Sequence, residues 1–128
     1  YRVIDLPGYG YAKVSKSVKK DWQEHLSEYL KQRQCLKGLF LLMDVRHPLK
    51  ELDRAMIDWS IVNQLPIHVL LTKSDKLSRN QALQSLQLVK NHYKTYHHLT
   101  IQLFSSQTKQ GLAELIEKLN EWFGELSC

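Results

Sequence analysis

The sequence predicts an α/β domain: a parallel sheet with helices on both faces, in three layers. Two observations predict it. Short, continuous apolar runs alternate along the chain with segments whose apolar residues recur at helical spacing. Little chain remains between these segments, and strands joined through helices pair in parallel. Composition agrees, because 43% of the 128 residues are apolar and 24% are charged, as in typical soluble globular proteins.

The first predicted elements are a short strand at residues 1–4 and a helix that begins at Ser17. The Ser17 hydroxyl is suited to accept hydrogen bonds from backbone N–H groups of the first helical turn. One face of this helix is apolar at most positions. That face is formed by Val18, Trp22, Leu26, Tyr29 and Arg33.

Two further strands read as continuous apolar runs, at residues 36–44 and 66–75, as expected for strands covered on both sides. Pro48 can open the helix between them, because its fixed φ suits the first helical position. The apolar stripe of that helix is Leu49, Leu52, Met56 and Trp59.

Ser78 and Gln81 have the spacing of a capping box and predict the start of another helix. Its inward residues are Ala82, Leu86, Val89 and Tyr93. A last strand at residues 99–106 precedes a closing amphipathic helix, whose apolar face is Leu112, Leu115, Ile116, Leu119 and Phe123. In parallel sheets of this kind, ligands bind beyond the carboxyl ends of the strands. The residues after each apolar run are therefore the candidate site.

The first strand end reads Asp5-Leu6-Pro7-Gly8. A carboxylate in this place can hold Mg²⁺, directly or through water. A glycine three residues later lets a backbone N–H approach a phosphate. The alternative is an ordinary loop with a turn glycine.

The second strand end reads Thr72-Lys73-Ser74-Asp75. Guanine presents two adjacent donors, the N1–H and the N2 amine, and a carboxylate can accept from both. Adenine has no such pair. The aliphatic stem of Lys73 can lie along a flat base while its ammonium stays in water. The alternative is a polar loop that precedes a helix.

The third strand end runs from Ser105 to Gly111 and begins with two serines. A residue as small as Ser106 leaves room for its backbone N–H to reach the guanine O6. The alternative is a serine-rich loop that caps the last helix.

Taken in order, these three motifs resemble the GTP-binding domain of the translation-factor-like P-loop GTPases. The longer stretches DLPGYGYAKV, LLMDVRHPLKELDRAMIDW and FSSQTKQGL resemble the EngB-type family, also called YihA or YsxC. The resemblance covers the whole chain. It implies that the protein binds GTP or GDP together with Mg²⁺, and that Asp5 holds the Mg²⁺ through water. The implied nucleotide-binding residues are Asp5, Leu6, Pro7, Gly8, Thr72, Lys73, Ser74, Asp75, Phe104, Ser105 and Ser106.

Two departures from the GTPase pattern affect the expected chemistry. Thr72 stands where Asn is common, although its hydroxyl can still tether a neighbouring loop. Tyr9 stands where many GTPases place the Gln that orients the attacking water. We therefore expect slow turnover and assign no catalytic residue.

The phosphate-cradling pattern G-x-x-x-x-G-K-S/T does not occur in the 128 residues. We therefore expect residues 1–128 to be the C-terminal part of a single GTP-binding domain, truncated at the N-terminus. This part alone is expected to be inactive.

The resemblance also implies a role in assembly of the large ribosomal subunit, and in cell division and septation. The expected partner is that subunit or its precursor. DNA is not expected to be a partner. A net charge of +5 permits a polyanionic partner. Four lysines after the glycine loop could contact RNA phosphates or simply form a solvated helix face. They are Lys13, Lys16, Lys19 and Lys20.

Two cysteines, Cys35 and Cys128, are too few for a disulfide framework. A reducing compartment, and therefore a cytoplasmic location, is predicted. No apolar run approaches the ~20 residues that a membrane-spanning helix needs, so no membrane partner is expected. The alternative function is a non-catalytic module that binds RNA or the ribosome without nucleotide turnover.

Overall fold

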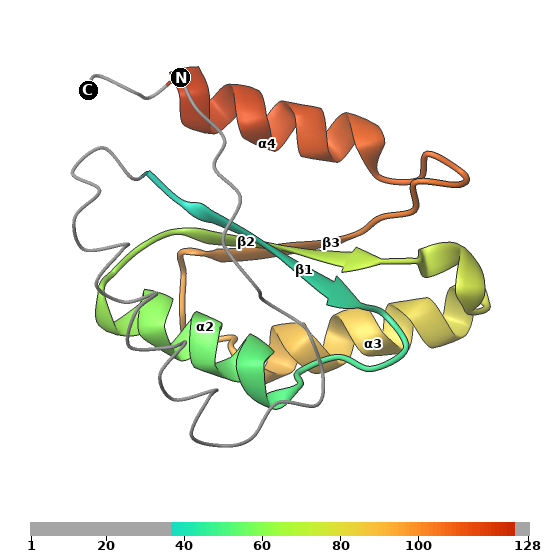
Figure 1. Cartoon of the computed structure of the whole chain (residues 1–128), viewed down its shortest axis with the longest axis horizontal. Helices are drawn as coiled ribbons and strands as arrows, with labels where there is room; N and C mark the ends of the chain where they lie inside the picture. Colours follow the sequence, from blue (N-terminus) through green and yellow to red (C-terminus); the bar gives the residue numbers. More distant parts are fainter. Residues whose placement is uncertain (1–36, 125–128) are drawn as a thin grey trace. The chain divides into compact units, whose positions relative to one another are not determined.

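The computed structural model describes residues 37–124. The predicted strand at residues 1–4, the helix that begins at Ser17 and the Asp5–Gly8 motif lie outside this range. The described elements are, in order, β1 (Leu39–Asp44), α2 (Glu51–Val62), β2 (Ile67–Thr72), the 3₁₀ helix η1 (Ser74–Lys76), α3 (Arg79–His92), β3 (Leu99–Leu103) and α4 (Leu112–Gly124) (Figure 1).

The three strands form one parallel sheet in the order β1-β2-β3. Leu39 pairs with Ile67, and Ile67 pairs with Leu99, so the strands start level with one another. At the other edge Asp44 pairs with Thr72. The strands therefore end together, and the loops that follow them emerge at the same edge. Five consecutive residues of the central strand are buried, which explains why all of them except His68 are apolar.

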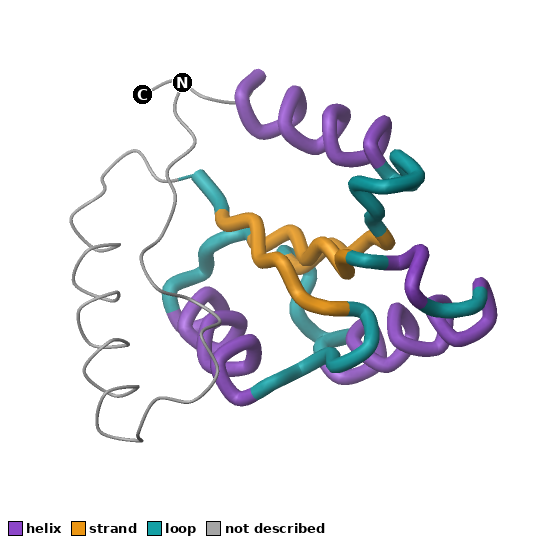
Figure 2. Tube along the Cα trace, turned by 45° about the vertical axis from the view of Figure 1, so that its right-hand side comes forward, coloured by secondary structure: helices purple, strands orange, loops and turns teal. Residues whose placement is uncertain are grey.

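Helices cover both faces of this sheet. Helices α2 and α3 lie on one face and α4 lies on the other, as both views show (Figures 1 and 2). The chain steps from β1 to β2 to β3 in one direction, and right-handed crossovers then place both connecting helices on the same side. The predicted arrangement of three layers is confirmed for the described residues.

The best-packed core lies between the sheet and the α2–α3 layer. In β1 the alternate residues Leu39, Leu41 and Met43 are at most 7% exposed, whereas Leu42 on the opposite face is 59% exposed. The strand at residues 36–44 was expected to be covered on both sides, and for Leu42 that is wrong within the described residues. On that face, α4 reaches β1 through Trp122, whose ring centroid lies 4.6 Å from that of Phe40.

Helix α2 begins at Glu51, three residues later than the expected start at Pro48. Leu49 has a left-handed φ of 59° and so lies outside the helix. The start is set by Asp53, whose Oδ2 accepts the Lys50 backbone N–H at 3.0 Å. A carboxylate in the first turn also complements the helix dipole.

The buried side of α2 is rotated from the predicted stripe. Met56 is buried as expected, but Leu52 and Trp59 are only half-buried. The buried residues of this helix are Asp53, Met56, Ile57 and Ser60.

Helix α3 begins as its sequence predicts. The Gln81 N–H donates to the Ser78 hydroxyl at 3.2 Å, and the Ser78 N–H donates to Gln81 Oε1 at 3.3 Å. This capping box is confirmed. Ala82, Val89 and Tyr93 are buried as expected, and Leu86 is half-buried.

Candidate functional site

The loops that follow β1, β2 and β3 are joined by backbone hydrogen bonds. The Val45 N–H donates to Thr72 O at 3.1 Å, which joins the first loop to the end of β2. The Ser74 N–H donates to Phe104 O at 3.1 Å, and the Phe104 N–H donates to Leu71 O at 2.9 Å. The structure thus brings the second and third predicted motifs together, and it adds the end of β1 to them.

The Thr72–Asp75 segment turns sharply after β2. Lys73 has φ 60° and ψ 36°, a left-handed conformation that is uncommon for a residue with a side chain. Its side chain is 58% exposed. The next residue, Ser74, is buried, and its hydroxyl donates to Gln110 Oε1 at 2.6 Å. Ser74 therefore ties the second loop to the third, and Lys73 projects outward.

Asp75 is held by a partner from the third loop. Its Oδ1 accepts a 2.7 Å hydrogen bond from the hydroxyl of Ser105, which is fully buried. Ser105 Oγ in turn accepts the Thr108 N–H at 3.2 Å. The Ser105 bond is the main reason that the pKa of Asp75 lies below its ordinary value. The carboxylate is therefore ionised at neutral pH.

The Asp75 carboxylate keeps acceptor capacity beyond the Ser105 bond. Lys76 Nζ lies 3.9 Å from Oδ2, and 18% of the Asp75 side-chain surface is open to solvent. A carboxylate offers about four lone-pair positions. Two further donors from a ligand can therefore bind here.

The loop from Ser105 to Gly111 is shaped by its own backbone. The Ser105 N–H donates to Gln110 O at 3.1 Å, and Gly111 has a φ of +80°. A Cβ at Gly111 would collide with the carbonyl oxygen of Leu103. Ser106 is exposed, and within residues 37–124 its N–H has no acceptor. This donor is therefore available to a ligand.

A polar network of Gln102, His68 and Thr100 supports this loop through a bond to Gly111. The Gln102 amide nitrogen donates to Gly111 O at 2.7 Å and to Leu103 O at 3.2 Å. Its oxygen therefore faces His68 Nε2, 2.8 Å away, and Nε2 carries the proton. His68 Nδ1 then accepts from the Thr100 hydroxyl at 2.6 Å. Burial lowers the pKa of His68, so the ring is neutral.

His68 and Gln102 also line a cavity of about 520 Å³ with residues of α4. Of the described residues, those predicted to hold a nucleotide, at 72–75 and 104–106, do not line it. They lie at the carboxyl ends of β2 and β3.

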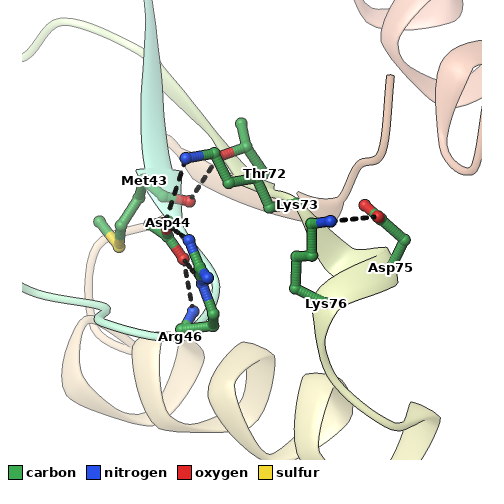
Figure 3. A network of polar contacts seen from close by, with 7 residues as sticks. All are labelled: Met43, Asp44, Arg46, Thr72, Lys73, Asp75 and Lys76. Carbon is green, nitrogen blue, oxygen red and sulfur yellow. Dashed lines mark hydrogen bonds and ion pairs between the residues drawn. The ribbon is translucent and has the colours of Figure 1, made fainter. Parts of the chain in front are cut away.

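The end of β1 carries an ion-paired cluster (Figure 3). Arg46 binds Asp44 through its backbone N–H at 2.9 Å, Nε at 3.1 Å and Nη2 at 2.9 Å. Lys73 Nζ lies 3.6 Å from Asp44 Oδ2. The side-chain bond from Arg46 holds the pKa of Asp44 well below its usual range. Nearby, the Thr72 hydroxyl donates to Met43 O at 3.4 Å, so Thr72 tethers the end of β1.

Comparison with known proteins identifies relatives over almost the whole chain. A Coxiella burnetii protein (strain CbuG_Q212) named "Probable GTP-binding protein EngB" is 53% identical over 123 residues, 95% of this chain. Proteins of the same name from Enterobacter sp. (strain 638) and Mannheimia succiniciproducens are 49% and 45% identical, each over 98% of this chain. Over the residues that it spans, this chain is similar to proteins named EngB. It covers 60–62% of the length of these relatives. No family model matches it.

Solved structures confirm the fold class of this chain. Translation elongation factor SelB from Methanococcus maripaludis, in its apo form, superposes with a TM-score of 0.69 at 18% identity, over 82% of this chain and 24% of SelB. The same factor in complex with the GTP analogue GPPNHP gives a TM-score of 0.64 at 16% identity, over 83% of this chain and 24% of SelB. The described residues therefore have a P-loop GTPase-like α/β fold.

Some of the residues singled out in the sequence lie outside the described range. They are Asp5, Leu6, Pro7 and Gly8, together with Tyr9 and the four lysines. Within residues 37–124 there is no group of three or more His, Cys, Asp or Glu side chains that could hold a metal ion. In the same range no helix is long and apolar enough to cross a membrane.

Asp44 and Arg46 were not predicted as site residues. A signal for Asp44 was present, because it is a carboxylate at the carboxyl end of an apolar run, as Asp5 is. Arg46 is brought to Asp44 by the turn after β1, and only the structure shows that contact.

Proposed function

We propose that this chain is the base-recognising part of a GTP-binding domain, and that the protein that carries it binds GTP and GDP. One observation carries the proposal: an ionised carboxylate, Asp75, is fixed by buried Ser105 at the carboxyl edge of the sheet. The relatives' name, GTP-binding protein, supports it.

Three groups at the strand ends divide the recognition of guanine. Asp75 accepts from the guanine N1–H and N2 amine, which adenine cannot supply together. The Ser106 N–H donates to O6. Lys73 lies with its stem along the base and its ammonium in water. Phe104 and Ser105 hold the loop over the base through their bonds to the second loop.

The phosphates are proposed to bind near Asp5, Leu6, Pro7 and Gly8. Asp5 would hold Mg²⁺ through water, and the Gly8 N–H would contact the γ-phosphate. Mg²⁺ supplies positive charge that offsets the charge on the phosphates. The phosphate-cradling loop is proposed to lie outside residues 1–128, and the relatives are longer than this chain. Because Tyr9 replaces the water-orienting Gln, turnover is slow. Because residues 1–128 contain no phosphate-cradling loop, they alone bind nucleotide weakly.

The family resemblance also supports a cellular role for the protein that carries this chain. We propose that it acts in the cytoplasm, in assembly of the large ribosomal subunit and in cell division. The lysines at 13, 16, 19 and 20 would contact ribosomal RNA. The second candidate, an RNA-binding module without nucleotide turnover, is favoured for the isolated chain because no phosphate loop occurs in its sequence.

Calorimetric titration of the full-length protein with GDP and ADP tests the proposed function. A site built to hydrogen-bond a base rejects an analogue that leaves its polar groups unpaired. GDP should therefore bind at least about 100-fold more tightly than ADP. Equal affinity for both nucleotides would contradict base recognition by Asp75. If neither GDP nor ADP binds but the protein still binds the ribosome, the RNA-binding module is favoured.

A further inference from the structure

We infer that Asp44 is a positioning residue for guanine-nucleotide binding, which acts by holding the ammonium of Lys73 at the end of β1. The inference rests on the proposed function of the Thr72–Asp75 loop. It concerns the Asp44–Arg46 turn, which that function does not use.

Arg46 first fixes the carboxylate of Asp44. Three donors of Arg46 reach the two carboxylate oxygens at 2.9–3.1 Å. The backbone N–H is one of these donors, so the orientation of Asp44 is tied to the turn itself. The Asp44 side chain is only 17% exposed. Asp44 therefore presents a fixed acceptor toward the neighbouring loop.

Lys73 is the group that this acceptor reaches. Asp44 pairs in register with Thr72 at the ends of β1 and β2, so the next residue, Lys73, emerges beside it. The ammonium lies 3.6 Å from Asp44 Oδ2, although 58% of the Lys73 side chain is exposed. A long exposed lysine side chain samples many rotamers when free. Here one end is anchored by the backbone turn and the other by Asp44.

This anchoring also keeps Lys73 apart from Asp75. Figure 3 shows two separate pairs, Lys73 with Asp44 and Lys76 with Asp75. The Lys76 pair is long, at 3.9 Å, and leaves the Asp75 carboxylate open. If Asp44 did not hold it, the Lys73 ammonium would be free to compete with a ligand for Asp75. Asp44 thus organises the lysine and preserves the acceptor before nucleotide binds.

A double-mutant cycle on the full-length protein tests this inference. GDP affinity is measured by calorimetry for the wild type, Asp44→Asn, Lys73→Met and the double variant. Because Asp44 orders the flexible Lys73 side chain before GDP binds, Asp44→Asn should weaken GDP binding about 2- to 10-fold. In the Lys73→Met background the same change should have no further effect, because Asp44 acts through Lys73. Asp58→Asn, an exposed carboxylate of α2, is the matched control and should bind as the wild type does.

Other outcomes overturn the inference in distinguishable ways. An equal loss in both backgrounds would mean that Asp44 only stabilises the turn. Unchanged or tighter binding by Asp44→Asn would show that it does not position Lys73. If the wild type has no preference for GDP over ADP, the proposed function fails and the inference fails with it. Should Asp44→Asn not fold, the same cycle with Asp44→Glu, which keeps the charge but displaces it, gives the coupling instead.

Discussion

The Ser105 hydroxyl donates a 2.7 Å hydrogen bond to Asp75 Oδ1, joining residues 30 positions apart in the sequence. Ser105 follows β3, and Asp75 follows β2, so this bond connects the second and third loops. It also contributes most to the lowered pKa of Asp75. The carboxylate is therefore oriented and ionised before any ligand arrives, which reduces the cost of ordering it on binding.

Replacing Ser105 by Ala should weaken GDP binding by the full-length protein about 10-fold, because a hydrogen bond to a charged group is lost. The pKa of Asp75 should rise toward its ordinary value. Ser106→Ala is the matched control, since it removes an exposed hydroxyl and keeps the backbone N–H. Calorimetric titration of both variants checks this, and equal affinities would show that Ser105 does not prepare Asp75.

Gly111→Ala should destabilise the fold by roughly 1–3 kcal/mol, the usual cost of a side chain in a sparsely allowed conformation. Its φ is +80°, and the new Cβ would meet the backbone carbonyl of Leu103, which cannot move aside easily. Denaturant unfolding measures the loss. Gln107→Ala, at an exposed position of the same loop, should change the unfolding free energy by less than about 0.5 kcal/mol. Equal stability of the two variants would contradict the geometry.

His68 should make the protein less stable as the pH falls. Burial is the main cause of its lowered pKa, so the unfolded chain binds the proton more readily than the folded one. The contribution of His68 to the free energy of unfolding is fully present above its ordinary pKa of 6.5. It is lost as the pH falls from there through the lowered pKa of the folded state.

Thermal unfolding between about pH 5 and 7 checks this contribution, with His68→Gln as the comparison. The wild type should lose stability relative to His68→Gln as the pH falls. ¹⁵N NMR should find the proton on Nε2, because Gln102 Oε1 faces that atom. A parallel pH dependence in both proteins, or a proton on Nδ1, would count against the network.

Much of this fold could be predicted because its signals are local. The apolar runs of β1, β2 and β3 and the Ser78–Gln81 capping box each lie within a few residues of sequence. The start of α2 was misjudged because two local signals compete there. Pro48 permits a helix, but Asp53 accepts the Lys50 N–H and sets the start three residues later.

The candidate site was only partly predictable. Asp75 and Ser105 were predicted as site residues because each lies in the loop just after an apolar run. Their mutual bond could not be found, because it depends on how the loops after β2 and β3 approach each other. The same holds for Asp44 and Lys73, which meet through strand register. Ser74 was predicted as a nucleotide-binding residue, and its hydroxyl donates to Gln110 Oε1, a bond to the third loop that the sequence does not indicate.

The central claim, that Asp75 reads guanine, is tested most directly by Asp75→Asn in the full-length protein. The amide keeps the size of the side chain but places a donor opposite the guanine N2 amine. Loss of the paired hydrogen bonds should lower GTP affinity on the order of 10²–10⁴-fold. Xanthine has a carbonyl oxygen in place of that amine and can accept from the new amide.

A competition titration of both proteins with GTP and xanthosine triphosphate is the decisive measurement. The wild type should prefer GTP, and Asp75→Asn should prefer xanthosine triphosphate. If Asp75→Asn weakens both nucleotides equally, Asp75 only holds the loop together and does not read the base.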